Sequence, residues 1–474
     1  MCGLFIIHRT NVRCEAGRKM TKEQNIKGSM TEGNPVKCMF AFAIPMIVGN
    51  IFQQMYNIVD SMIVGKVVGS DALAAIGAST AITQLFVMVA IGAGIGCSVV
   101  ISQYFGAERI EEMKSSISTA LCSILVLSLA LSLIGRLGSS WILAWMKTPQ
   151  NVFTEAVTYL NIYFYGFFFL FMYNAFSAIF NALGDSKKPL YFLLFSSALN
   201  IGLDLLFVKG FGWGVSGAAW ATLIAQAVSA FLSGIVLLIK LKKIPSAPFA
   251  IYRFSLLGQM SKVAVPTILQ QSMVSIGMLL IQTVVNRFGS AFLAGYTAAI
   301  KIDGMAIVPM VNAGNATSTF VAQNMGAKKD KRAVLGYHIG LAMAVGIGLF
   351  IGIMMFFFGD VTIEAFMDTA KDAEAANAIA AGVEYIGTVS MFYFVMGAMN
   401  VTNAVLRGAG DVKWFMISTL ANLSVRVLFV YALADATSGQ IIIWANPIGW
   451  TIAFLIAYIR YRQGGWRRVD LLKE

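Results

Sequence analysis

Twelve apolar stretches run through this chain of 474 residues, and each is long enough for a helix to cross the roughly 30 Å of hydrocarbon in a bilayer. They lack the strict alternation of a lipid-facing barrel strand, and only helices then satisfy the backbone inside hydrocarbon. The sequence therefore predicts an all-α integral membrane protein with twelve transmembrane helices. The stretches lie near residues 37–64, 72–104, 115–137, 152–182, 190–208, 214–239, 263–286, 291–325, 333–358, 379–406, 414–433 and 441–459.

Composition excludes the main alternatives. Only 12% of the residues are charged, about half the usual fraction of a soluble domain, which is too little to cover a soluble surface. The formal net charge of +12 does not indicate nucleic acid, because the basic residues fall in short patches between the apolar stretches. The two histidines and five scattered cysteines form no metal motif, and no Walker sequence is present. We expect no enzyme activity, no cofactor and no metal beyond a possible Na⁺.

Lysine and arginine are distributed unequally between the two sides of the membrane. An even number of spans places both termini on one side, and 27 of the 35 basic residues fall on that side against six on the other. The positive-inside rule then predicts a multi-pass protein of the cell (inner) membrane with both termini cytoplasmic. The first 29 residues hold an apolar island too short for a signal peptide, and Met1, Met20 and Met30 are alternative start positions.

Motifs of the first half recur in the second half. Gly69-Ser70-x-x-Leu73-Ala74 returns 220 residues later as Gly289-Ser290-x-x-Leu293-Ala294, and Gln103-x-x-Gly106-Ala107 returns as Gln323-x-x-Gly326-Ala327. The repeat predicts two six-helix lobes that are related by a pseudo-two-fold axis along the membrane normal, with a cleft between them. The predicted domains are a polar N-terminal segment (1–36), an N-lobe with helices 1–6 (37–240), a cytoplasmic connector (241–262), a C-lobe with helices 7–12 (263–460) and a cytoplasmic tail (461–474).

Ionisable residues deep within the spans are the first functional candidates, because they are costly there. At about 1.5 Å of rise per residue, Asp60 and Asp204 lie at similar depths of about 9 and 7.5 Å from the outer side. Asn200 lies one turn before Asp204, and Thr222 falls in the same slab. Such oxygen ligands suit a hard cation or a proton, although Asn200 and Thr222 singly are equally compatible with interhelical hydrogen bonding. The candidate cation-binding residues are Asp60, Asn200, Asp204 and Thr222, with a supporting polar stripe of Gln53, Tyr56 and Asn57.

Three more charged residues lie inside the C-terminal spans. Arg426 occupies the repeat position of Asp204, so the second half carries the opposite charge there. Lys301 and Asp303 are two residues apart and cannot share one helical face. Two interpretations stay open for Lys301, Asp303 and Arg426: a structural ion pair, or contact with a substrate in the cleft.

Several of these motifs resemble the multidrug and toxic compound extrusion (MATE) family over residues 30–474. The resemblance rests on the run from Asn50 to Gly65 that contains Asp60, on the two Gln-x-x-Gly-Ala loops and on Leu-Arg-Gly-Ala-Gly-Asp at 406–411. It implies twelve helices in two lobes and cation-coupled export of small, often cationic amphiphiles. In one branch of the family, the cation ligands match Asp60, Asn200, Asp204 and Thr222. Other branches carry a Glu on the seventh helix, where this chain has Gln270, Gln271 and Val274, so a C-lobe cation site is not expected.

The sequence thus favours a secondary active antiporter that exports small cationic amphiphilic compounds by alternating access and is coupled to Na⁺ or H⁺. The expected partners are a small-molecule substrate and the lipid bilayer, with no nucleic acid, and the expected state is a monomer. One alternative is a flippase for lipid-linked sugars, which would favour a broad cationic cavity. Another is a scaffold or channel that does not transport actively.

Overall fold

The computed structural model describes residues 29–366 and 373–472, and every regular element within these ranges is helical. The alternative starts Met1 and Met20 and most of the predicted N-terminal segment lie outside the described residues. The first half contains α1 (Pro35–Val67), α2 (Ser70–Gly106), α3 (Ile110–Trp145), α4 (Gln150–Ala182), α5 (Lys187–Asp204), the π-helical turn η1 (Leu205–Gly210) and α6 (Gly214–Lys242). The second half contains α7 (Phe254–Val285), η2 (Asn286–Phe288), α8 (Gly289–Ala306), α9 (Val308–Gly326), α10 (Asp330–Phe366), α11 (Ala373–Ser390), α12 (Tyr393–Ala409), α13 (Val412–Leu433), α14 (Gln440–Arg462) and η3 (Gly465–Arg468).

Two of the predicted spans are each built from two helices. Only Ile307 separates α8 from α9, and Pro309 in the first turn of α9 explains the break, because proline offers no backbone N–H to the preceding turn. α11 and α12 are bent by 52° at the short break between them. When each pair is counted as one span, the helices in the described ranges form twelve spans. The predicted all-α fold class is confirmed.

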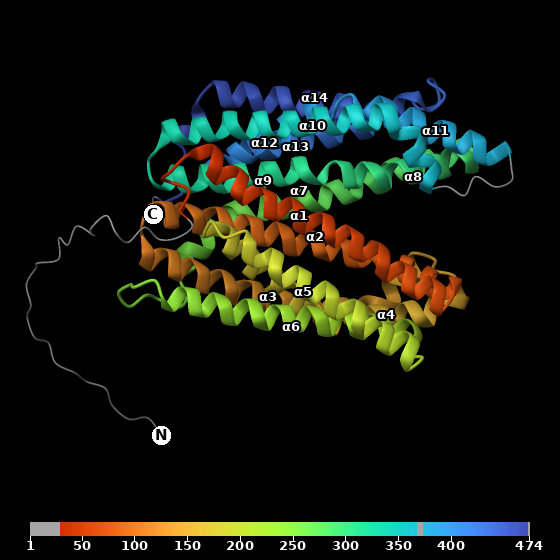
Figure 1. Cartoon of the computed structure of the whole chain (residues 1–474), viewed down its shortest axis with the longest axis horizontal. Coiled ribbons are helices and arrows are strands. Elements are labelled where there is room, and N and C mark those ends of the chain that lie inside the picture. The colour runs from red at the N-terminus through yellow and green to blue at the C-terminus, as the bar shows by residue number, and fades with distance from the viewer. Residues whose placement is uncertain (1–28, 367–372, 473–474) are drawn as a thin grey trace, which may run out of the picture.

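The helices form two lobes, α1–α6 and α7–α14 (Figure 1). The lobes lie close together at the end that carries the C-terminus and separate toward the opposite end. We call these the terminal end and the wide end. α1 runs diagonally between them: it begins beside the C-lobe at the terminal end and ends in the N-lobe at the wide end (Figure 1).

The sequence repeat is also a repeat of contacts. Asp185 lies in the turn before α5 and accepts a hydrogen bond from Lys240 at the end of α6, at 3.0 Å. Asp411 lies in the turn before α13 and accepts one from Arg460 at the end of α14, at 2.6 Å. Each lobe therefore ties its last helix to the same turn with the same kind of ion pair, as expected for a duplicated unit.

At the terminal end, the segment before the first helix of each lobe lies against the other lobe. Residues 30–33 lie against α10, where the Arg332 guanidinium donates to three of their backbone carbonyls at 2.6–3.1 Å. The link between α6 and α7 lies against α3, where Lys114 Nζ donates to the Ile244 carbonyl at 2.7 Å and to Ser246 Oγ at 2.9 Å. These crossed segments hold the two lobes together at this end.

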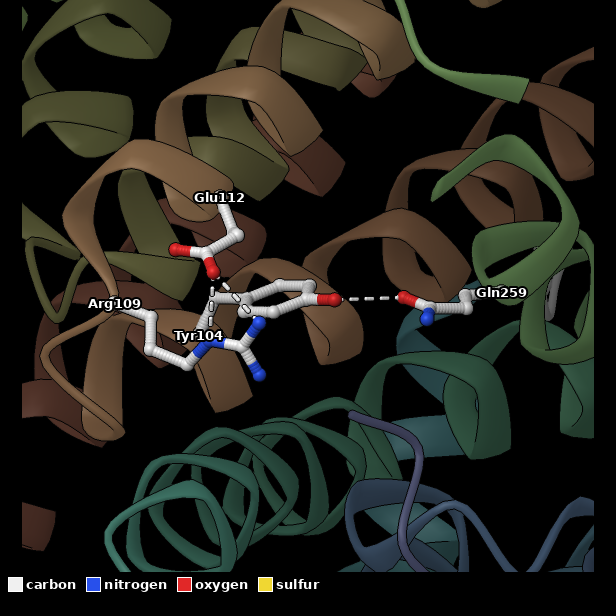
Figure 2. Close-up of polar contacts among 4 residues, drawn as sticks. All are labelled: Tyr104, Arg109, Glu112 and Gln259. Atoms are coloured by element: carbon white, nitrogen blue, oxygen red, sulfur yellow. Dashed lines mark hydrogen bonds and ion pairs between the residues drawn. The ribbon is translucent and has the colours of Figure 1, made fainter. Parts of the chain in front are cut away.

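A second contact joins α2 to α7 (Figure 2). The Tyr104 hydroxyl donates to Gln259 Oε1 at 2.9 Å. The Arg109 guanidinium lies 5.1 Å from the centre of the Tyr104 ring and forms an ion pair of 2.6 Å with Glu112. The turn between α2 and α3 thus fixes a tyrosine that reaches the first helix of the other lobe.

Candidate functional site

Four oxygen-bearing side chains meet in the N-lobe, from three helices. Asp60 comes from α1, Asn200 and Asp204 from the last turns of α5, and Thr222 from α6. With its amide nitrogen facing Asp204, the Asn200 side chain donates to Asp204 Oδ2 at 2.9 Å and accepts from the Thr222 backbone N–H at 3.1 Å. In the opposite orientation it donates to Thr222 Oγ1 at 3.3 Å. Either way, Asn200 connects α5 to α6, and in the first orientation it also orients Asp204.

The carboxyl groups of Asp60 and Asp204 lie next to one another. One oxygen of each, Oδ1, is buried and has no hydrogen-bond partner. Within the described residues, neither carboxyl forms an ion pair with Lys, Arg or His. Two buried carboxyl groups without a basic partner are costly unless a cation or a proton joins them. Their free oxygens fit a Na⁺ ion or a proton.

The chain changes its helical hydrogen bonding at this point. α5 ends at Asp204, and the next six residues form the π-helical turn η1. Such turns widen the helix and are frequent at functional sites. The sequence gives no cue to this turn, because residues 205–208 continue the apolar pattern of the span.

The three residues of the predicted polar stripe on α1 lie in different surroundings. Tyr56 lies beside Thr222 at the edge of the four-oxygen cluster. Gln53 lines a cavity between the lobes, whereas Asn57 is exposed, with its amide 3.3 Å from Gln54 Oε1. Tyr159 of α4, which was not among the predicted site residues, is buried. It lies close enough to Asp60 and Asp204 to interact electrostatically with both carboxyl groups.

A cavity of about 670 Å³ lies between the lobes. Its wall is rich in Asn, Gln, Ser and Met side chains, and it includes Gln270, Gln271 and Val274 of α7. None of the four candidate cation ligands lines it. The four-oxygen cluster and the cavity are therefore separate features of this structure. The charged residues of the wall are Asp303, Arg407 and Arg426.

The charged C-lobe residues do not form the ion pair that the sequence left open. Asp303 is buried and accepts a hydrogen bond from the Tyr393 hydroxyl at 2.8 Å. Lys301, two residues earlier, is exposed and outside the cavity wall, as the helical spacing predicts. In the described part of the chain, no carboxylate lies within 4.0 Å of the Arg426 guanidinium. Arg426 faces the cavity instead of forming an ion pair.

Two glutamines close the terminal end. Gln103 Nε2 of α2 donates to the Gly408 carbonyl in the C-lobe at 3.0 Å, and Gln323 Nε2 of α9 donates to the Ala182 carbonyl in the N-lobe at 2.9 Å. Both bonds are buried, and their donors and acceptors occupy equivalent positions in the two halves. We call this pair of bonds the glutamine clasp.

The helix ends beside the clasp leave no space for a side chain. A Cβ at Gly106 would meet the backbone carbonyl of Gln323, and a Cβ at Gly326 would meet that of Gln103. The repeated Gln-x-x-Gly-Ala motif therefore brings α2 and α9 together across the pseudo-two-fold axis. The sequence analysis used this motif as a sign of duplication and of family resemblance and did not predict that it joins the lobes.

Comparison with known proteins places the chain in a family. The MatE family model matches residues 45–206 and 266–432, one segment in each lobe. The chain belongs to the MatE family. The probable multidrug resistance protein YpnP of Bacillus subtilis is 31% identical over 448 residues, which cover 94% of this chain and 98% of YpnP. The predicted membership of the MATE family is thus confirmed.

Solved structures share the fold of this MatE protein. A multidrug resistance MATE family transporter in an outward-facing conformation matches with a TM-score of 0.86 and 23% identity, covering 94% of this chain and 100% of the other. A MOP superfamily transporter from Pyrococcus furiosus matches with a TM-score of 0.87, at the same identity and coverage. Both matches extend over the two lobes.

Proposed function

We propose that this MatE protein is a secondary active exporter that exchanges Na⁺ or H⁺ for its substrate across the cell membrane. The observation that carries the proposal is the pair of carboxyl groups, Asp60 and Asp204, that contact one another without a basic partner. Asn200 and Thr222 add neutral oxygens, which a Na⁺ ion uses and a proton does not need. We therefore expect either gradient to drive export, with Na⁺ the more effective of the two.

We propose alternating access between the lobes as the transport mechanism. The closed terminal end and the cavity between the lobes support one state of such a cycle. In the other state the glutamine clasp would be broken. A cation drives the exchange only if it binds the two states with different affinities, and α1 carries Asp60 while also contacting both lobes.

The size and mixed polar and apolar lining of the cavity support a proposal of small amphiphilic substrates. The name of the relative YpnP, a probable multidrug resistance protein, agrees with this substrate class. The charged residues of the cavity do not support a preference for cations, because Asp303 is engaged by Tyr393 and two arginines accompany it. We therefore propose amphiphilic compounds without restriction to cations. We propose further that the working unit is a monomer with an N-lobe at 37–240 and a C-lobe at 263–460.

Efflux from reconstituted vesicles tests the exporter directly. Vesicles loaded with a fluorescent amphiphile should lose it when a Na⁺ gradient or a pH gradient is imposed and keep it when both are collapsed. Efflux that is independent of both gradients would overturn the coupling.

Topology offers an independent prediction. We propose cytoplasmic termini, so Lys242→Cys and Lys331→Cys, placed in a chain without other cysteines, should react with an impermeant maleimide only when the cytoplasmic face is exposed. Gln150→Cys, at the wide end, is the matched control and should react from outside intact cells. Labelling of position 331 from outside would reverse the orientation and the direction of transport.

A further inference from the structure

One arginine in the cavity wall, Arg426, has no hydrogen-bond or ion-pair partner among the residues that the structure describes. Arg426 of α13 is partly buried, and its Nε is buried without a hydrogen-bond acceptor. None of the hydrogen bonds or ion pairs among the described residues involves its guanidinium group. A guanidinium keeps its charge and carries five N–H donors, so an unpaired one in a partly dry wall is costly. This cost indicates a group that binds there during the transport cycle.

The surroundings of Arg426 keep it accessible from the cavity. Asn422, one turn earlier on the same helix, also lines the wall, and its Oδ1 has no partner. On α14, Gly449 faces both side chains, and a Cβ there would collide with them. The absence of a side chain at position 449 lets Asn422 and Arg426 lie along the wall instead of being displaced.

The other charges of the wall are already engaged. Asp303 acts on Arg426 through its charge but lies beyond ion-pair distance, and Tyr393 holds its carboxyl. The Nε of Arg407 also lacks an acceptor, but this side chain is only 9% exposed, donates to Asn315 Oδ1 at 2.9 Å and lies 5.7 Å from the centre of the Phe415 ring, whereas Arg426 is more exposed and makes no such contacts. With two arginines and one aspartate, the wall carries one net positive charge, and Arg426 is the group that offers it to a ligand.

We propose that Arg426 binds an anionic group, such as a carboxylate, on amphiphilic substrates that occupy the cavity. This inference rests on the proposed export function and adds a substrate class to it. The planar guanidinium matches a carboxylate with two parallel hydrogen bonds, which a lysine cannot reproduce. Met396, Met399 and Trp450 lie in the same wall and supply an adaptable surface for the apolar part of the molecule. A volume of about 670 Å³ suits a small molecule.

Binding of two matched dyes to the purified protein tests this site without any gradient. The probes are a rhodamine with a free carboxylate and its ethyl ester, which differ only in that group. Arg426→Met should weaken binding of the acid by about tenfold or more, because a charge-assisted hydrogen bond is lost. Binding of the ester should change by less than about twofold, because the ester makes no such bond. Arg426→Lys should restore part of the affinity for the acid.

The ester also reports that the variant is folded, and Asp303→Asn is a charge control that should not weaken binding of the acid. Equal losses for both dyes, an unchanged affinity for the acid, or a wild-type protein that does not bind the acid would each overturn the inference. A wild-type protein that binds both dyes as expected but moves neither under imposed gradients would contradict the export function and leave the Arg426 site standing.

Discussion

Asp60→Asn and Asp204→Asn should each abolish gradient-driven efflux while the amount of protein in the membrane stays near normal. Asparagine keeps the shape of the side chain, so the packing around α1 and α5 should survive, but the charge that binds the cation is lost. Loss of a group that only supports a metal ligand already costs about 10–100-fold in affinity, so loss of a carboxylate ligand should cost at least as much. The measurement is dye efflux from vesicles under an imposed Na⁺ or pH gradient.

Two kinds of control accompany this experiment. Asp360→Asn changes an exposed carboxylate of α10 and should leave efflux unchanged. Asn200→Ala and Thr222→Ala remove neutral oxygens and should mainly raise the Na⁺ concentration needed for half-maximal efflux. Full efflux in either Asp60→Asn or Asp204→Asn would refute the assignment of the coupling site.

Gly106→Ala and Gly326→Ala should each reduce transport sharply. The added methyl group would collide with a backbone carbonyl of the other lobe. Neither helix end can move away from this collision without separating α2 from α9. Overpacking of this kind costs about 1–3 kcal/mol, which lowers the ratio of closed to open terminal ends roughly 5- to 150-fold. Efflux should fall accordingly, because a terminal end that does not close allows the substrate to return.

Accessibility of the cavity from the terminal end separates this effect from simple misfolding. A cysteine placed at Ser318, in the cavity wall, should react faster with a maleimide added on the cytoplasmic side when Gly326 is replaced by Ala. Gly346→Ala is the matched control, because a Cβ at that position of α10 meets no atom within 4 Å. If Gly326→Ala transports normally and leaves position 318 protected, the glutamine clasp is not a gate.

Much of the fold could be predicted from the sequence, because apolar length and helical rise are local properties. The twelve spans follow from the lengths of the apolar stretches, and the similar depth of Asp60 and Asp204 follows from the helical rise. Their contact also depends on how α1 packs against α5. The break at Ile307 was missed although Pro309 marks it. A proline within a long apolar run is also compatible with one continuous helix, as Pro45 in α1 shows.

Contacts between the lobes could not be predicted in the same way. The glutamine clasp joins positions about 140 and 305 residues apart in the chain, and depth alone does not indicate which carbonyl a glutamine reaches. The partners of Arg426 also depend on the rotation of α13 and on the space left at Gly449. An ion pair with Asp303 and contact with a substrate in the cavity were therefore both compatible with the sequence.

Cation binding to the purified protein is the most direct test of coupling through the N-lobe alone. Na⁺ titrations at several pH values should show a saturable site in the wild-type protein and in Asp303→Asn, with protons competing for it, and should show no such site in Asp60→Asn. Loss of Na⁺ binding in Asp303→Asn together with its retention in Asp60→Asn would place the site in the C-lobe and contradict the proposed mechanism.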